Sequence, residues 1–339
     1  MGILRVKQKL PLYAVLAGLA MATFLMSWAA VFPPEKVESS YSRWIYPAFS
    51  TGFSFVTDAV PFSWLDVCIP VVLAVLVYSL IRRRWRLLIA VSSVLYLWFF
   101  WSWGLNYHRL SVADRMHLSS ANLNEADRQR FSDLAVRELN RLWPLASKSP
   151  LEWAQVSSMA SGRVERVVAV IDGTTWRAPK RVKWSLFAGP WYQVAGIDGM
   201  FNPFGQEPLV VKTALPFELP FLMSHELAHV GGVANEGDAN LVGVLATIAS
   251  DDPRFQYSGW LEIWRYLRIP QSRLDPGPQA DLRAIRERVL AHQIRSVSNI
   301  QSAVLDAHLK ANAVPDGIRS YSDFLAVAIA SQPRWAEFR

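Results

Sequence analysis

Three long apolar stretches near the start of this 339-residue chain limit its fold more than any other feature. A helix needs about 20 apolar residues to cross the hydrocarbon core of a bilayer. The first stretch has the layout of a signal peptide, but its length and the stretches after it favour an uncleaved span. For the second, a buried core helix is an open alternative. The sequence therefore predicts a mainly α membrane protein with three transmembrane helices, at about residues 10–32, 61–81 and 87–105.

Basic residues flank these stretches unevenly. Three lie within residues 5–9 and four within residues 82–86, whereas the longer segment 33–64 holds only two. Cytoplasmic loops of membrane proteins carry the excess of Lys and Arg. We therefore expect a multi-pass protein of the cytoplasmic membrane, with its N-terminus in the cytoplasm and everything after Asn106 outside.

Overall composition fits this interpretation. Hydrophobic residues make up 52% of the chain and charged residues 19%, a balance that leans towards membrane proteins. The net charge of +7 comes partly from the basic loops, and no second basic cluster indicates a nucleic-acid partner. Cys68 is the single cysteine, which excludes an intrachain disulfide.

Residues 1–106 are thus expected to form the membrane domain, and residues 107–339 one extracytoplasmic domain. Apolar spacing predicts that this second domain is mostly helical, with a small β element at Pro208–Val211. Val164–Ile171 fits either strand or helix, and the Gly- and Pro-containing segment Ala188–Gly205 is expected to be an ordered loop. Helices are expected over about residues 125–143, 217–229, 235–250, 259–268, 279–310 and 323–329.

The motif with the clearest chemistry is His225-Glu226-Leu227-Ala228-His229, an H-E-x-x-H. On a helix, His225 and His229 share one face, so both imidazoles can bind one Zn²⁺ ion. Glu226 is then placed to act as the general base on a zinc-activated water. Gly231 and Gly232 follow and predict the end of the helix. The competing interpretation is a pair of packed helix histidines without a metal.

Beyond that turn, Glu236, Ala239 and Asn240 resemble the Glu-x-x-Ala-Asp arrangement of Glu-type zinc peptidases, in which the glutamate is the third ligand. Asn240, one helical turn past Glu236, is expected to support a ligand imidazole as a hydrogen-bond partner. Glu236 as a solvated charge at a helix start is the alternative, and Asp238 is the next candidate ligand. The metzincin class of zinc peptidases would require a histidine at position 235. This chain has Asn235 there, so it does not fit the metzincin pattern.

Peptide hydrolysis also requires a donor for the tetrahedral oxyanion. Tyr321 is the residue that we predict for this role, and Arg319 and His308 are the other candidates. Sequence spacing does not rank the three.

Segments spread over most of the chain resemble a family of bacterial membrane proteins, the domain of unknown function numbered 3810. The segments that carry the resemblance are Tyr46-Pro47, Pro61-Phe62-Ser63, Trp103–Tyr107, Gly199–Phe204, the block from Leu219 to Asn240, and Gly317–Tyr321. Two places depart from the family pattern. Gly237-Asp238 stands where the family tends to have Asp-Glu, and Gly205-Gln206 where it tends to have Thr-Gly.

The resemblance implies a membrane-anchored, zincin-like metallopeptidase of the bacterial inner membrane, with zinc held by His225, His229 and Glu236. Its expected partners are the bilayer and a peptide or protein substrate, with Pro208–Val211 as a strand that pairs with the substrate backbone. The alternative from another class is a non-catalytic membrane sensor or assembly factor with a structural or ligand-binding zinc site. A membrane scaffold with a chance motif is the third.

Overall fold

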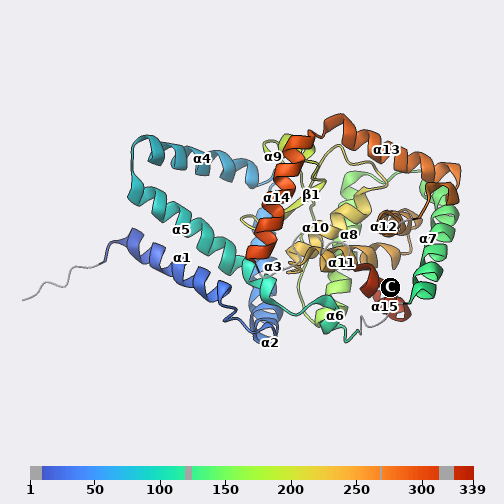
Figure 1. Cartoon of the computed structure of the whole chain (residues 1–339), viewed down its shortest axis with the longest axis horizontal. Helices are drawn as coiled ribbons and strands as arrows, with labels where there is room; N and C mark the ends of the chain where they lie inside the picture. Colours follow the sequence, from blue (N-terminus) through green and yellow to red (C-terminus); the bar gives the residue numbers. More distant parts are fainter. Residues whose placement is uncertain (1–9, 119–123, 268, 313–323) are drawn as a thin grey trace, which may run out of the picture.

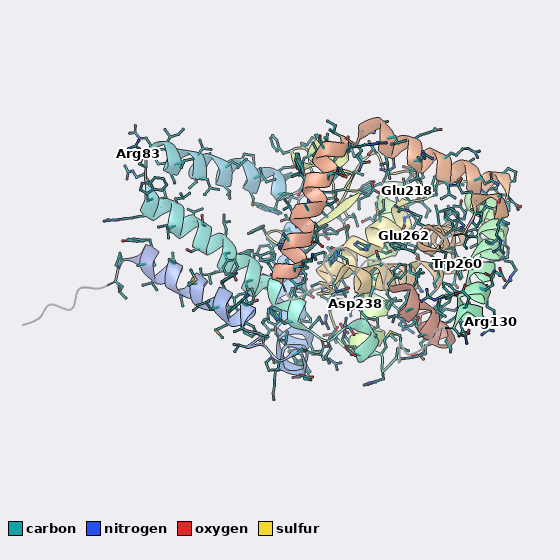
Figure 2. All side chains as sticks on the ribbon, in the orientation of Figure 1. Arg83, Arg130, Glu218, Asp238, Trp260 and Glu262 are labelled. Atoms are coloured by element: carbon teal, nitrogen blue, oxygen red, sulfur yellow. The ribbon has the colours of Figure 1, made fainter. Side chains whose placement is uncertain are left out.

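The computed structural model describes residues 10–118, 124–267, 269–312 and 324–339. Three apolar helices project to one side of a larger helical body (Figure 1). They are α1 (Leu12–Trp28), α4 (Leu65–Ile81) and α5 (Trp85–Ser102). Arg83, in the turn between α4 and α5, lies at the tip farthest from the body (Figure 2).

Among the described residues, α5 is the one helix long and apolar enough to cross a membrane, and α1 and α4 are shorter apolar helices. Large hydrophobic side chains cover their outer surfaces, including Leu19, Val71 and Ile81. This surface is compatible with membrane association. Three spans and their orientation stay a prediction.

The segment that joins α1 to α4 is largely helical. It folds into α2 (Pro34–Lys36), a π-helical stretch η1 (Val37–Ile45) and α3 (Tyr46–Asp58). Both longer elements bury one face against the body, since Val37, Tyr41, Tyr46 and Ser50 are all buried. Tertiary packing, which no short sequence window contains, orders this segment.

The body consists of helices around one short hairpin. The Asn124 side chain accepts a hydrogen bond from the Asp127 backbone N–H and begins α7, as the sequence predicts. The segment 164–171, which from its sequence fits either strand or helix, is helical and lies within α8. The remaining helices are η2 (Gly104–His108), α6 (Val112–Arg115), α7 (Glu125–Ala146), α8 (Trp153–Asp172), α9 (Ala188–Ala195), α10 (Leu219–Val230), α11 (Glu236–Ile248), α12 (Pro253–Tyr266), η3 (Gln271–Arg273), α13 (Pro276–His292), α14 (Arg295–Ala311), α15 (Phe324–Ser331) and η5 (Gln332–Phe338).

The stretch 188–205 is not the loop that its Gly and Pro content predicts. It begins with α9 and ends in strand β1 (Gly199–Asn202), which pairs antiparallel with β2 (Glu207–Val210). Met200 lies opposite Leu209 in this hairpin. The β element expected at 208–211 is therefore present, shifted by one residue.

Two helix boundaries also differ from expectation. The single helix expected over 279–310 is two helices, α13 and α14, with a break at Gln293 and Ile294. The helix expected from about residue 259 begins earlier, as α12 at Pro253, because the Asp252 side chain caps it and proline is favoured in a first helical turn. The break places α14 between the body and the ends of α4 and α5 that are nearest to it (Figure 1).

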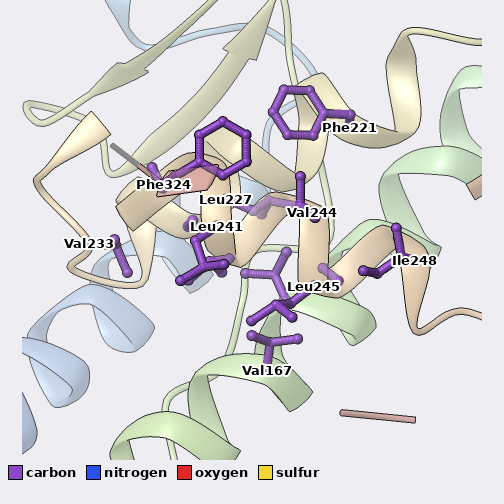
Figure 3. Packing of buried hydrophobic residues seen from close by; sticks show 14 of the residues in the cluster. Val167, Phe221, Leu227, Val233, Leu241, Val244, Leu245, Ile248 and Phe324 are labelled. Atoms are coloured by element: carbon purple, nitrogen blue, oxygen red, sulfur yellow. The ribbon is translucent and has the colours of Figure 1, made fainter. Parts of the chain in front are cut away.

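Helices α10 and α11 lie in the middle of the body and pack against each other, with α8 and α12 around them. Their apolar side chains interlock, among them Leu227, Leu241 and Val244 (Figure 3). The same buried cluster continues into Tyr46, Phe100 and Trp103. Burying a side chain of this size stabilises the fold by about 1.5–3 kcal/mol. One core thus joins the central helices to the residues next to the apolar helices.

Candidate metal centre

Helix α10 carries the H-E-x-x-H motif and is buried on almost every side. Proline stands in its first turn, and the Phe221 backbone N–H donates to Ser258 Oγ at 3.1 Å. The Ser224 hydroxyl donates to the Pro220 carbonyl at 2.7 Å, within the helix. This framework fixes the direction in which the motif side chains leave the helix.

The ligand atoms of the three predicted residues converge on one point. His225 Nε2 and His229 Nε2 are 3.2 Å apart. Glu236 Oε2 lies 3.2 Å from His225 Nε2 and 3.4 Å from His229 Nε2. Two imidazole nitrogens and one carboxylate oxygen therefore lie together at the meeting of α10 and α11.

The imidazole of His229 is oriented by a backbone group. Its Nδ1 lies 2.7 Å from the Val233 carbonyl oxygen, which can only accept, so Nδ1 carries a proton and, in the neutral ring, Nε2 presents its lone pair. His225 Nδ1 is buried and, within the described residues, has no hydrogen-bond partner. Burial lowers the pKa of His229, but the carboxylates of Glu236 and Glu226 outweigh burial and raise it to about 9.

Glu226 is 5% exposed, and within the described residues its Oε2 atom has no hydrogen-bond partner. Burial raises its pKa to about 7, against the opposing effect of the His225 and His229 charges. Gly199 in β1 lies directly over this carboxylate, because a Cβ atom there would be 2.4 Å from Glu226 Oε1. The hairpin thus covers the glutamate that follows the first histidine of the motif.

Glu236 begins α11 after a tight turn. Gly232 has a φ of +84°, in the left-handed region that favours glycine, and a Cβ atom there would lie 2.9 Å from the Tyr46 ring. The Asn235 side chain caps α11 by accepting from the Asp238 backbone N–H at 3.1 Å. Burial raises the pKa of Glu236, but the two motif histidines outweigh it and hold the pKa far below its usual range.

Four side chains from the N-terminal third bind the carbonyl groups at the end of α10 and in the turn after it. The last carbonyl groups of a helix have no partner within the helix, so buried ones need donors from elsewhere. Trp103 Nε1 donates to the His229 carbonyl at 3.1 Å, and Arg109 Nη1 donates to the Gly232 carbonyl at 2.9 Å. The Val230 carbonyl accepts from Tyr46 Oη at 2.9 Å and from Ser50 Oγ at 3.0 Å.

Two of the other predicted residues have different surroundings. Asp238 Oδ2 accepts from the Val112 backbone N–H at 2.9 Å, and Asp238 is not part of the ligand cluster. Asn240 Nδ2 donates to Tyr266 Oη at 3.3 Å. Support of a ligand imidazole by Asn240 stays a prediction.

The candidates for the oxyanion donor divide between described and undescribed parts of the chain. Tyr321 and Arg319 lie outside the described residues. His308 on α14 lies 3.4 Å from Tyr107 Oη, measured from Nε2. Burial raises the pKa of Tyr107 and the charge of Glu236 raises it further, which places Tyr107 within electrostatic reach of the ligand cluster.

The chemistry of the donor set suits zinc. Structural and catalytic zinc sites use histidine nitrogen and carboxylate oxygen, and a catalytic site takes three protein ligands and keeps a fourth position open. Three such atoms converge here, one imidazole is already oriented through its other nitrogen, and a buried carboxylate lies beside them. His225, His229 and Glu236 therefore fit a zinc ion.

Sequence reasoning found the ligand cluster and missed the residues that surround it. Tyr46, Trp103 and Gly199 lie in segments that carry the family resemblance, so those segments were the available signal. Arg109 and Ser50 lie outside the segments that carry the family resemblance, so nothing in the sequence pointed to them. Their contacts with the end of α10 join positions more than 120 residues apart in the chain.

Fold and site together define a class: a mostly helical protein with apolar helices on one side and a His-His-Glu cluster in its core. The chain belongs to the family described as protein of unknown function (DUF3810), whose model matches residues 41–329. No curated protein and no solved structure matches the chain.

Proposed function

We propose that this protein is a membrane-anchored, zinc-dependent metallopeptidase with a zincin-like domain outside the bacterial cytoplasmic membrane. The observation that supports the proposal best is the convergence of His225 Nε2, His229 Nε2 and Glu236 Oε2 within 3.4 Å of one another. Glu226, next to the first ligand and buried, is the second part of this constellation.

His225, His229 and Glu236 would hold the ion. A zinc ion bound there supplies a Lewis acid for the substrate carbonyl and makes water nucleophilic near neutral pH. Glu226 would take the proton from the attacking water and deliver it to the departing amine nitrogen. The hairpin over Glu226 would keep its carboxylate in place. The substrate-pairing role expected for Pro208–Val211 does not fit, because β1 pairs with one edge of β2 and the Lys183 backbone hydrogen-bonds to Pro208 and Val210 on the other.

Zinc content and proteolysis, measured on the purified full-length protein and on Glu226→Gln, test this proposal. We expect one zinc per chain in both proteins and a loss of cleavage of about 10²–10⁴-fold in the variant, the range for removal of a general base. His229→Ala is the matched control, which should lose the metal itself. Zinc in the wild type with cleavage unchanged in Glu226→Gln would contradict the role of Glu226.

The same variants separate the peptidase from the sensor or assembly factor. A non-catalytic protein would keep its cellular function in Glu226→Gln and lose it in His229→Ala, because only the second removes the zinc. Absence of zinc from the wild-type protein would contradict both and favour the scaffold.

The proposed topology has its own test. A periplasmic reporter fused after Asn106 should be active, since we place that residue outside the membrane. If instead a reporter that works only in the cytoplasm is active at this position, the proposed location of the catalytic domain is wrong. The proposed metal site would not be affected by that result.

A further inference from the structure

Helix α9 is fastened to one end of the apolar helix α4. Asp66, in the first turn of α4, accepts hydrogen bonds from the backbone N–H groups of Leu186 and Phe187, at 2.9 and 3.1 Å. Leu65 and Ile69 of α4 also pack on the buried side of α9. These contacts hold α9 beside the first turn of α4, where the apolar part of α4 begins.

Helix α14 is held at the corresponding end of α5. The His308 ring contacts the ring of Phe99, in the last turn of α5, with 5.8 Å between the ring centres. At its other end, the Ile294 backbone N–H donates to the Val194 carbonyl in α9 at 2.9 Å. Helix α14 thus runs from α9 to the end of α5, across the direction of the apolar helices (Figure 1).

The two helices turn apolar side chains to the surface. On α14, Leu309 is buried, whereas Ile300 is 63% exposed and Val304 is 58% exposed. Ala303 and Ala307 are exposed as well, which completes an apolar face at helical spacing. On α9 and the turn before it, Leu186, Phe187 and Trp191 are exposed. We call these seven residues the apolar rim.

Lipid is the occupant that fits the apolar rim best. An amphipathic helix that lies in a membrane surface buries one apolar face between the headgroups and the acyl chains. Helices α9 and α14 lie beside the first turn of α4 and the last turn of α5, on the side nearest the body (Figure 1). The rim on these two helices therefore continues the exposed apolar surface of α4 and α5. Tryptophan is also enriched at this level in membrane proteins.

The rim also lies close to the ligand cluster. Behind it, His308 on the same helix meets Tyr107, and Trp103 at the end of α5 donates to the carbonyl of the ligand His229. Helix α14, which carries part of the rim, therefore contacts Tyr107, a residue near the cluster. A rim in the headgroups would hold the metal centre at the membrane surface.

We propose that α9 and α14 lie in the headgroup layer of the bilayer and bind it through the apolar rim. This inference rests on the membrane anchoring in the proposed function and adds a lipid-binding surface to it. Peptide hydrolysis is not needed for the rim to bind lipid, so the two can fail separately.

Spin labels at single cysteines test the proposal in the full-length protein. In a Cys68→Ser background, labels would be placed at Phe187→Cys and Ile300→Cys in lipid nanodiscs. Val71→Cys, on the exposed side of α4, is the lipid reference, and Arg130→Cys, at the far end of the body, is the water reference (Figure 2). Collision rates with oxygen, which concentrates in lipid, and with a water-soluble nickel chelate report depth.

We expect Phe187 and Ile300 labels to show an oxygen-to-nickel ratio above that of Arg130 and towards that of Val71. Lipid-like values at Val71 with water-like values at Phe187 and Ile300 would overturn the rim and leave the proposed function standing. Labels shielded from both reagents would also overturn it, because they would indicate protein over the rim. A water-like Val71 would overturn membrane anchoring as well. Helical circular dichroism of the labelled proteins, equal to that of the unlabelled protein, confirms folding without reference to zinc.

Discussion

Replacement of Arg109 by leucine tests whether the buried ion pairs of this residue stabilise the fold and the turn before Glu236 more than an ion pair on the surface would. The Arg109 side chain is 4% exposed and donates to Glu38, to Asp172 and to the Gly232 carbonyl. Asp172 has Arg115 as a second partner. Arg109→Leu keeps an apolar side chain in the space and removes the charge and every hydrogen bond.

The expected cost follows from burial. Removal of one partner from a buried ion pair leaves the other charge without compensation and costs about 3–5 kcal/mol. The Gly232 carbonyl also loses its donor, and an unsatisfied buried group costs a further ~1–3 kcal/mol. Since Asp172 keeps Arg115 and Glu38 keeps Arg43, we expect a total at the lower end of the combined range, about 4–5 kcal/mol of unfolding free energy. The turn before Glu236 loses a contact, so zinc affinity should fall too.

The measurement is chemical unfolding of the full-length protein in detergent micelles, together with zinc titration. Arg130→Leu is the matched control, because Arg130 pairs with Asp127 on the surface, where its side chain is 72% exposed. Exposed pairs of this kind contribute roughly 0–1 kcal/mol. Equal losses of stability in Arg109→Leu and Arg130→Leu would refute the reasoning.

The pH dependence supplies a second check on Arg109. Burial raises the pKa of Glu38 and of Asp172, but the Arg109 and Arg115 charges outweigh it and hold both below their usual values. Both carboxylates therefore stabilise the wild type above pH of about 4, and this is lost as pH falls through their folded-state pKa values. Arg109 interacts with the ionised form of Glu38, so its removal raises the pKa of Glu38 even though Arg43 and Arg115 still lower it. The deficit of the variant should therefore widen above about pH 4 and narrow below it.

Three further predictions concern the metal centre. Gly199→Ala should reduce cleavage strongly and leave zinc bound, since the added Cβ would lie 2.4 Å from Glu226 Oε1, and equal loss of zinc would show a broader collapse. Trp103→Phe should cost about 0.5–1.5 kcal/mol of unfolding free energy, because the buried His229 carbonyl loses the Trp103 hydrogen bond and keeps the Gly232 N–H as a donor, whereas Trp85→Phe on the exposed side of α5 should cost less. Zinc at 1,000 times its Kd should stabilise the wild type by about 4 kcal/mol in thermal unfolding. Chelation should reverse this, with no change in His229→Ala.

The ligand cluster could be predicted from sequence because its geometry is local. One helical turn separates His225 from His229, and two glycines followed by Asn235 return the chain so that Glu236 approaches them. Each of these features acts over a few residues. The structure accordingly brings together the three residues that the spacing selects.

The segment 33–64 could not be predicted in the same way. Its helices are stabilised by tertiary contacts: the hydroxyl groups of Tyr46 and Ser50 donate to the Val230 carbonyl, about 180 residues further along the chain. The break between α13 and α14 has the same origin, since the Ile294 N–H binds Val194 rather than a carbonyl of its own helix. Contacts over such distances leave no periodic pattern.

The orientation of the motif helix connects the apolar helices to the site. The carbonyl groups at the end of α10 need donors, and the described structure supplies them from Tyr46, Ser50, Trp103 and Arg109, all within the first 109 residues. A division of the chain at residue 106, as the sequence suggests, would separate three of these four donors from their acceptors. Since His229 begins the turn that these donors fix and Glu236 ends it, residues next to the apolar helices are part of what holds two of the candidate metal ligands together. The apolar helices and the candidate metal centre are therefore joined in one structural unit.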